Sequence, residues 1–133
     1  MNAEKQALVE AWWTKASHDL TAVRVLLGAS PPALDIAVYH CQQAAEKAIK
    51  AWLVWKDIPF PKTHDLEALL KLCMPLDPGF ETLMPHAHVL TPYVAEFRYP
   101  GDTLEPAADD AQEALRLAAE VLDYVNERIV FPS

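Results

Sequence analysis

The sequence predicts an all-α protein, an up-and-down helical bundle of four main helices plus a short helix, in one domain over residues 1–133. Apolar residues recur every three or four positions over long stretches, which is the spacing of one helix face. No segment shows the alternation typical of a strand, and no internal repeat occurs. With 52% hydrophobic residues and only three glycines, a chain of this length can bury a core without disulfides or metals.

The first predicted helix covers residues 3–27, with Asn2 as a candidate N-cap and Gly28 as its stop. The second is expected to open with Ser30 as the cap and Pro31 in the first helical position, and to run to about Trp55. Their predicted core stripes are Leu8, Trp12, Ala16, Leu20, Val23 and Leu27 in the first helix, and Val38, Cys41, Ala45, Ala48, Ile49 and Trp52 in the second.

The second half of the chain predicts shorter helices and one long one. A short helix over residues 64–73 is expected to be capped by Thr63. A helical stretch over 80–90 contains Pro85, which marks either its start or a kink, and a helical turn after Thr91 must end before Pro100. The last helix, from about 106 to 129, has a predicted seam of Ala108, Ala111, Leu115, Ala118, Leu122, Val125 and Ile129.

Charge and cysteine usage narrow the classes of function. The net charge is −8 and the pI about 5.0, so broad binding to the DNA backbone is not expected, although a local anion pocket is compatible with this charge. Cys41 and Cys73 stand apart in apolar contexts, which predicts free buried thiols and a cytoplasmic protein. No membrane span and no leader segment are expected.

Several polar side chains interrupt the predicted packing. Asp19 lies at the edge of the first apolar stripe, either as an acid paired with Lys or Arg of a neighbouring helix or as a pocket wall. Glu46 and Lys50 are spaced for an i,i+4 ion pair. A line of polar residues on the second helix is either a solvated face or a set of ligand groups. That line on the second helix consists of His40, Gln43, Lys47 and Lys50.

No metal site and no cofactor are predicted. His86 and His88 have no Cys or acid nearby in sequence, so surface or packing histidines explain them better than ligands. None of the glycine-rich phosphate motifs or the common hydrolase motifs occurs. A nucleotide would therefore have to be held by side chains.

Three landmarks in sequence order resemble the HEPN domain family, which is named for higher eukaryotes, prokaryotes and nucleotide binding. They are "HDL" in the first helix, "QQAAEKAIKA" continuing to "KTHDL", and "RYP" at residues 98–100. The resemblance covers nearly the whole chain. It implies a helical bundle that commonly forms dimers, and for many bacterial members a minimal nucleotidyltransferase partner in a toxin–antitoxin pair.

Many relatives of this type are metal-independent ribonucleases, whose signature is an Arg and a His separated by four to six residues. After Arg98, the positions where that His would stand hold Thr103, Leu104 and Glu105. The usual ribonuclease assignment therefore fails, no catalytic residue is assigned, and whether the protein is an enzyme stays open. A His from elsewhere, such as His64 or His40, would have to replace the missing base.

These observations leave three hypotheses. The first is a homodimeric binding module for a nucleotide or its phosphate, paired with a minimal nucleotidyltransferase. The second is a ribonuclease with a non-standard base, acting on RNA. The third is a purely structural ion network in which Arg98 meets Glu46 or Asp19. Under the first, the ligand-binding residues are Arg98, Tyr99, Lys47, Lys50, Gln43 and His64, with Glu46 and Asp19 orienting the cations.

Overall fold

The computed structural model describes residues 2–97, 99–101 and 105–131. Its described residues form five α-helices and two short 3-10 helices, with no strand among them, so the all-α prediction is confirmed. The elements are α1 (Ala3–Gly28), α2 (Leu34–Trp55), α3 (Leu66–Cys73), η1 (Pro78–Leu83), α4 (Met84–Leu90), η2 (Thr91–Val94) and α5 (Ala108–Asn126). In the described part of the chain, no helix is both long and apolar enough to cross a bilayer.

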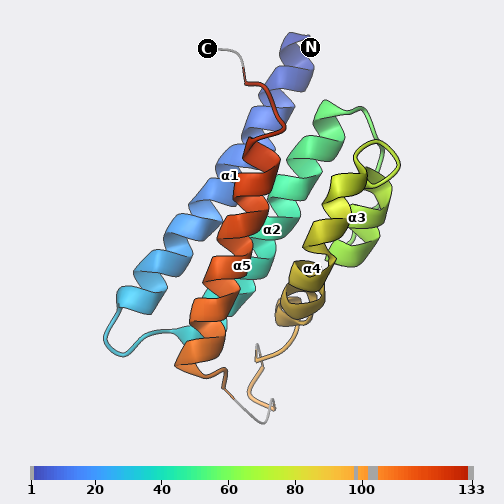
Figure 1. Cartoon of the computed structure of the whole chain (residues 1–133). Helices are drawn as coiled ribbons and strands as arrows, with labels where there is room; N and C mark the ends of the chain where they lie inside the picture. The colour runs from blue at the N-terminus through green and yellow to red at the C-terminus, as the bar shows by residue number, and fades with distance from the viewer. Residues whose placement is uncertain (1, 98, 102–104, 132–133) are drawn as a thin grey trace.

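The central element is α2, which packs against α1, α3 and α5 (Figure 1). The long helices α1 and α2 run antiparallel, α5 returns in the direction of α2, and α3 and α4 lie on the other side of α2 (Figure 1). Because neighbours surround it, α2 is buried on most of its circumference, including the whole predicted stripe from Val38 to Trp52. Polar side chains on this helix are therefore surrounded by packed core residues, and they need hydrogen-bond or ion-pair partners within the protein.

The predicted limits of α1 are confirmed, and Asn2 caps it by accepting a hydrogen bond from the Lys5 amide at 2.8 Å. Its buried face differs slightly from the prediction: Leu8 is half exposed and Val9 is buried in its place. On α5 the buried face is also rotated from the predicted seam. Ala108 is exposed and Leu115 only partly buried, while Ala114, Leu117 and Val121 join the core.

Two predicted helix starts are wrong, and local chemistry explains both. The second helix begins at Leu34 instead of Pro31, because Pro31 is followed by Pro32 and a residue before proline is pushed out of the α region. The third begins at Leu66 instead of His64, because the Asp65 carboxylate is the N-cap. It accepts from the amides of Glu67 and Ala68 at 3.0 and 3.3 Å, whereas Thr63 accepts only from the Asp65 amide.

The segment around Pro85 divides into two helices. A 3-10 helix over Pro78–Leu83 precedes α4, and Pro85 lies in the first turn of α4, so it marks a start and not a kink. Phe80 of η1 inserts its ring between the rings of Trp52 and Tyr124, at centroid distances of 4.6 and 4.8 Å. Gly79 lies against the Tyr124 hydroxyl, where a Cβ would collide. These tilted and edge-to-face aromatic contacts join η1 to both α2 and α5.

Cys41 and Cys73 are free and buried, as predicted, and burial raises the pKa of each thiol to about 12. We expect neither thiol to react with iodoacetamide at pH 8 until the chain unfolds. Because the folded state holds these protons more tightly than the unfolded state, their contribution to stability is complete below pH 9 and is lost as the pH rises toward 12. Alkylation followed by mass spectrometry, with and without denaturant, tests this; rapid modification of the native protein would contradict it.

Candidate functional site

The polar side chains of α2 do not form a solvated face. Gln42, Gln43, Glu46 and Lys50 are all buried. A buried polar group is costly unless it is hydrogen-bonded, and a buried charge more so unless it is paired. The partners of these residues therefore decide whether the group is structural or able to bind a ligand. They separate into two clusters along the helix.

The inner cluster consists of Gln42, Gln43, Glu46, Lys50 and His64. The Glu46 carboxylate pairs with the Lys50 ammonium at 3.0 Å, which confirms the predicted i,i+4 pair, and with the His64 Nδ1 at 2.7 Å. The Gln42 amide donates to Glu46 at 3.1 Å and to the His64 carbonyl at 2.8 Å, and Gln43 donates to Gln42. The cluster thus ties the loop before α3 to the middle of α2.

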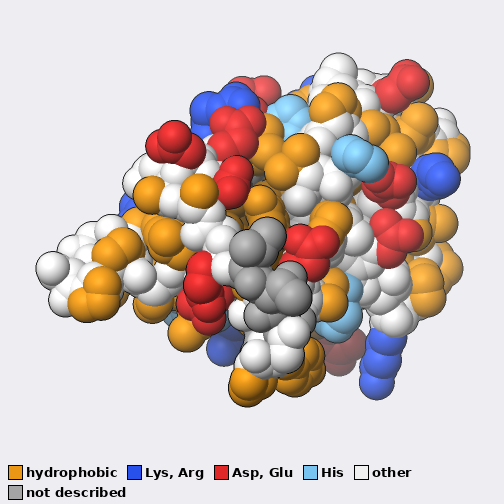
Figure 2. Space-filling model, turned by 90° about the horizontal axis from the view of Figure 1, so that it is seen from below, with side chains coloured by type: hydrophobic (Ala, Val, Ile, Leu, Met, Phe, Trp, Pro, Cys, Tyr) orange, Lys and Arg blue, Asp and Glu red, His pale blue; other side chains and the backbone are white. Residues whose placement is uncertain are grey.

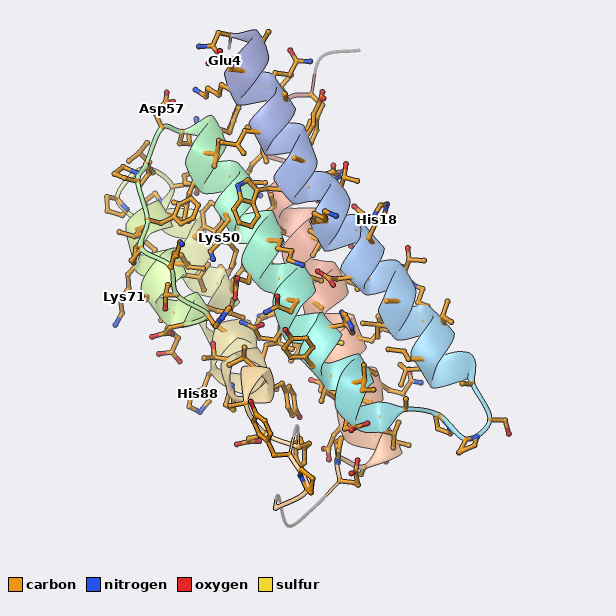
Figure 3. The ribbon with its side chains drawn as sticks, turned by 180° about the vertical axis from the view of Figure 1, so that it is seen from behind. Glu4, His18, Lys50, Asp57, Lys71 and His88 are labelled. Carbon is orange, nitrogen blue, oxygen red and sulfur yellow. The ribbon has the colours of Figure 1, made fainter. Side chains whose placement is uncertain are left out.

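Lys50 is enclosed within this cluster. Its ammonium lies 5.5 Å from the Trp12 ring centroid and 5.6 Å from that of Phe60, and its side chain is 8% exposed. Figure 3 shows Lys50 on α2, whereas His18 points away from the bundle on the outer side of α1. A cation that is paired with a carboxylate and covered by two rings is satisfied within the protein. This placement favours a positioning role for Lys50, and its role as a ligand contact stays a prediction.

The outer cluster consists of Asp19, His40 and Lys47. Asp19 of α1 pairs with the Lys47 ammonium at 2.7 Å through one oxygen and with the His40 Nδ1 at 2.8 Å through the other. The predicted pairing of Asp19 with a basic residue of a neighbouring helix is confirmed. The side chains of His40 and Lys47 are 30% and 24% exposed, so this cluster reaches solvent. Among the described residues, the His40 Nε2 makes no hydrogen bond.

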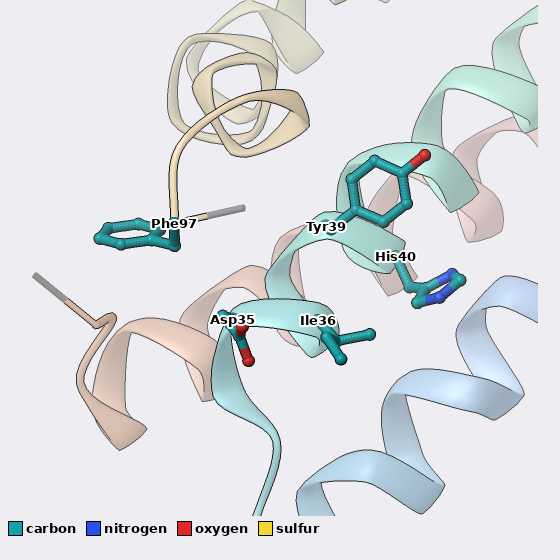
Figure 4. Close-up of a pocket in the computed structure, with 5 residues that line it drawn as sticks. All are labelled: Asp35, Ile36, Tyr39, His40 and Phe97. Atoms are coloured by element: carbon teal, nitrogen blue, oxygen red, sulfur yellow. The ribbon is translucent and has the colours of Figure 1, made fainter. Parts of the chain in front are cut away.

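A hollow of about 310 Å³ opens next to the outer cluster. It is lined by Asp35, Ile36, Tyr39 and His40 of α2 and by Phe97 (Figure 4). Phe97 has a φ of 65°, a left-handed conformation that is unfavourable for a bulky residue and that occurs preferentially at functional sites. His40 belongs to both the outer cluster and the wall of the hollow, so the charged pairs and the hollow form one site.

This site lies toward the end of the bundle that carries the α1–α2 loop. Seen from that end, acidic and hydrophobic side chains alternate over the surface (Figure 2). The carboxylates on this face should repel free polyanions. A ligand would have to be selected by the local groups of the site.

The structure brings together some of the predicted site residues. Lys47 and Asp19 are joined in the outer cluster, and Gln43, Glu46, Lys50 and His64 in the inner one. Tyr99 is largely exposed, and Arg98 lies outside the described residues. Both acids that the structural hypothesis offered to Arg98 have other partners in the two clusters.

The hollow itself was missed by sequence reasoning, apart from His40. A signal was present, because Ile36, Tyr39, His40, Gln43 and Lys47 follow the three- and four-residue spacing of one helix face. The approach of Phe97 to that face has no counterpart in local spacing. It depends on how the segment after η2 returns toward α2.

The two histidines of the HxH pair have separate carboxylate partners. His86 Nε2 contacts Glu120 of α5 at 2.7 Å, and His88 Nδ1 lies 3.4 Å from Glu67 of α3 (His88 is labelled in Figure 3). Among the described residues, no three His, Cys, Asp or Glu side chains gather in a way that could hold a metal ion.

The protein is a helical bundle whose central helix, α2, carries buried polar side chains as well as much of the apolar core. The chain matches the HEPN domain family over residues 9–128 and therefore belongs to that family. Two crystal structures are similar to it. One, an archaeal HEPN homologue, is 27% identical, with a TM-score of 0.71, covering 92% of this chain and 98% of its own. The other, from Thermus thermophilus, is 28% identical, with a TM-score of 0.74 and coverages of 91% and 98%. None of the curated proteins matches significantly.

Proposed function

We propose that this HEPN domain protein is a cytoplasmic, homodimeric binding module for a nucleotide or its phosphate, and that it acts with a minimal nucleotidyltransferase in a toxin–antitoxin type system. The partner and the system rest on the resemblance to bacterial HEPN proteins. The binding role rests on one observation in particular. A single buried carboxylate, that of Asp19, holds a lysine and a histidine side by side at the edge of a hollow that also has aromatic walls.

This arrangement suits a ligand with an aromatic and an anionic part. Tyr39 and Phe97 provide apolar surface for a base. The Lys47 ammonium is a donor for a phosphate, and the His40 Nε2 is a second donor when the imidazole carries both protons. Asp19 fixes both donors in place before the ligand arrives, which lowers the entropic cost of binding. Arg98 follows Phe97 in the sequence, and its role as a bidentate anion ligand stays a prediction.

Calorimetry with ATP, AMP and inorganic phosphate tests this proposal. We expect Lys47→Ala and Arg98→Ala each to weaken nucleotide binding about tenfold or more, since a charge-assisted hydrogen bond contributes about 1.5–3 kcal/mol. Arg116→Ala is the matched control, because Arg116 is exposed on α5 and pairs only with Glu113 and Glu120 among the described residues. The helical circular dichroism should not change. A wild-type protein that binds none of the three ligands would overturn the proposal.

One observation favours a second function, a metal-independent ribonuclease with a non-standard base. Asp19 engages the His40 Nδ1, an arrangement that orients the imidazole so that Nε2 can take a proton from a ribose 2′-hydroxyl. The 2′-oxygen would then attack the adjacent phosphorus while the bond from that phosphorus to the 5′-oxygen of the next nucleotide breaks. The departing 5′-oxygen would take a proton from water, and the products would be a 2′,3′-cyclic phosphate end and a 5′-hydroxyl end. Cleavage of RNA in the presence of EDTA, lost in His40→Ala, would select this alternative over pure binding.

A further inference from the structure

We propose that the hollow binds the ribose of a ribonucleotide, with the Asp35 carboxylate accepting hydrogen bonds from the 2′- and 3′-hydroxyls. This inference rests on the proposed nucleotide-binding function and assigns the orientation and the sugar preference of the ligand. It starts from Asp35, which lies in the first turn of α2 and in the wall of the hollow (Figure 4).

Asp35 is an acceptor that has no partner within the described part of the chain. Its side chain is partly buried, yet among the described residues it makes neither a hydrogen bond nor an ion pair. The dipole of α2 favours an acid in this turn. A carboxylate that points into solvent would gain the same stabilisation, so the dipole does not explain why Asp35 is partly buried in the hollow. A partly buried carboxylate without such a partner gains from hydroxyl or amine donors of a ligand.

The charge of Asp35 also orients the ligand. A phosphate next to this carboxylate would be repelled, so the anionic end must lie at the opposite side of the hollow. That side is formed by His40, five residues along α2, which corresponds to a rise of about 7.5 Å. The Lys47 ammonium lies there too, because it is bound to the same Asp19 carboxylate as His40. Ribose at Asp35 and phosphate at His40 and Lys47 thus fit one ligand.

The remaining walls match the base. Ile36, Tyr39 and Phe97 supply the apolar part of the lining. The volume of about 310 Å³ is at the lower end of the range for small-molecule pockets. It provides room for one nucleoside, so that a mononucleotide fits and a second base would have to lie outside.

The test compares ATP, 2′-deoxy-ATP and 2′,3′-dideoxy-ATP by calorimetry on the full chain. The wild type should bind ATP about tenfold or more tightly than the dideoxy compound, with 2′-deoxy-ATP between them. Asp35→Asn should bring the three affinities within about threefold of each other, because an amide is a weaker acceptor. Lys47→Ala should weaken all three by the same factor, since it acts on the phosphate end.

Asp109→Asn is the matched control, as Asp109 is an exposed acid in the first turn of α5 and should leave both the affinities and the discrimination unchanged. Equal wild-type affinities for ATP and dideoxy-ATP, or discrimination that survives Asp35→Asn, would overturn the ribose assignment while leaving nucleotide binding intact. Absence of binding for all three compounds would overturn the proposed function, and this inference with it.

Discussion

Replacing Glu46 with Ala is expected to lower the free energy of unfolding by about 3–5 kcal/mol, the usual cost of leaving a buried charge without its partner. Glu46 is the acceptor for Lys50, His64 and Gln42, and its side chain is only 4% exposed. Without it, the Lys50 ammonium stays between two aromatic rings with no counter-charge. Urea unfolding followed by circular dichroism measures the loss.

A double variant distinguishes the effect of leaving a charge unpaired from the effect of losing buried side-chain volume. Glu46→Leu with Lys50→Met removes both charges and keeps apolar volume, so its stability should be close to that of the wild type or higher. Lys50→Met alone should be destabilising, because it leaves the buried Glu46 with only the exposed His64 and the neutral amide of Gln42 as partners. If Glu46→Ala and the double variant were equally unstable, the loss would come from packing and not from the unpaired charge.

Phe80→Ala should cost about 3–5 kcal/mol, the range for truncating a fully buried aromatic residue. The Phe80 ring touches Trp52 of α2 and Tyr124 of α5, so the truncation opens a cavity where three elements meet. Thermal and urea unfolding should both show the loss. The Trp52 fluorescence should also change in the native state, because its ring loses its contact with the Phe80 ring.

The matched control for this change is Leu76→Ala, in the same connection between α3 and α4. Leu76 is 57% exposed, so its truncation should change stability by no more than about 0.5 kcal/mol. If Leu76→Ala lowered the stability as much as Phe80→Ala, the effect would not be specific to the aromatic contacts of Phe80, and the whole connection would contribute to stability.

The long helices could be predicted from sequence because their stability follows from one-dimensional periodicity. The limits of α1 and the stripe of α2 depend on spacing and on Asn2, which are local features. The starts of α2 and α3 were harder to predict, because several neighbouring residues in each segment could begin or cap a helix. There the second proline at position 32 and the stronger cap at Asp65 decided the outcome.

In the candidate site, ion pairs within one helix or between two adjacent helices could be predicted. These are the pair of Glu46 with Lys50 and the pairing of Asp19 with a basic side chain of the neighbouring helix. The pairing of His64 with Glu46 was not predicted, because the third helix was expected to begin at His64 and it begins at Leu66. The hollow beside His40 could not be predicted, since Phe97 reaches α2 from more than fifty residues away in sequence.

The burial of α2 on most of its circumference has a consequence for evolution and for engineering. The same helix forms the core of the bundle and carries its charged groups. A substitution in α2 that alters the charged clusters therefore also affects core packing, and the reverse holds as well. Sequence drift should therefore accumulate on the outer faces of α1 and α5 and be slow along α2. A new ligand specificity would be reached most readily through the segment around Phe97, which borders the hollow without forming the core.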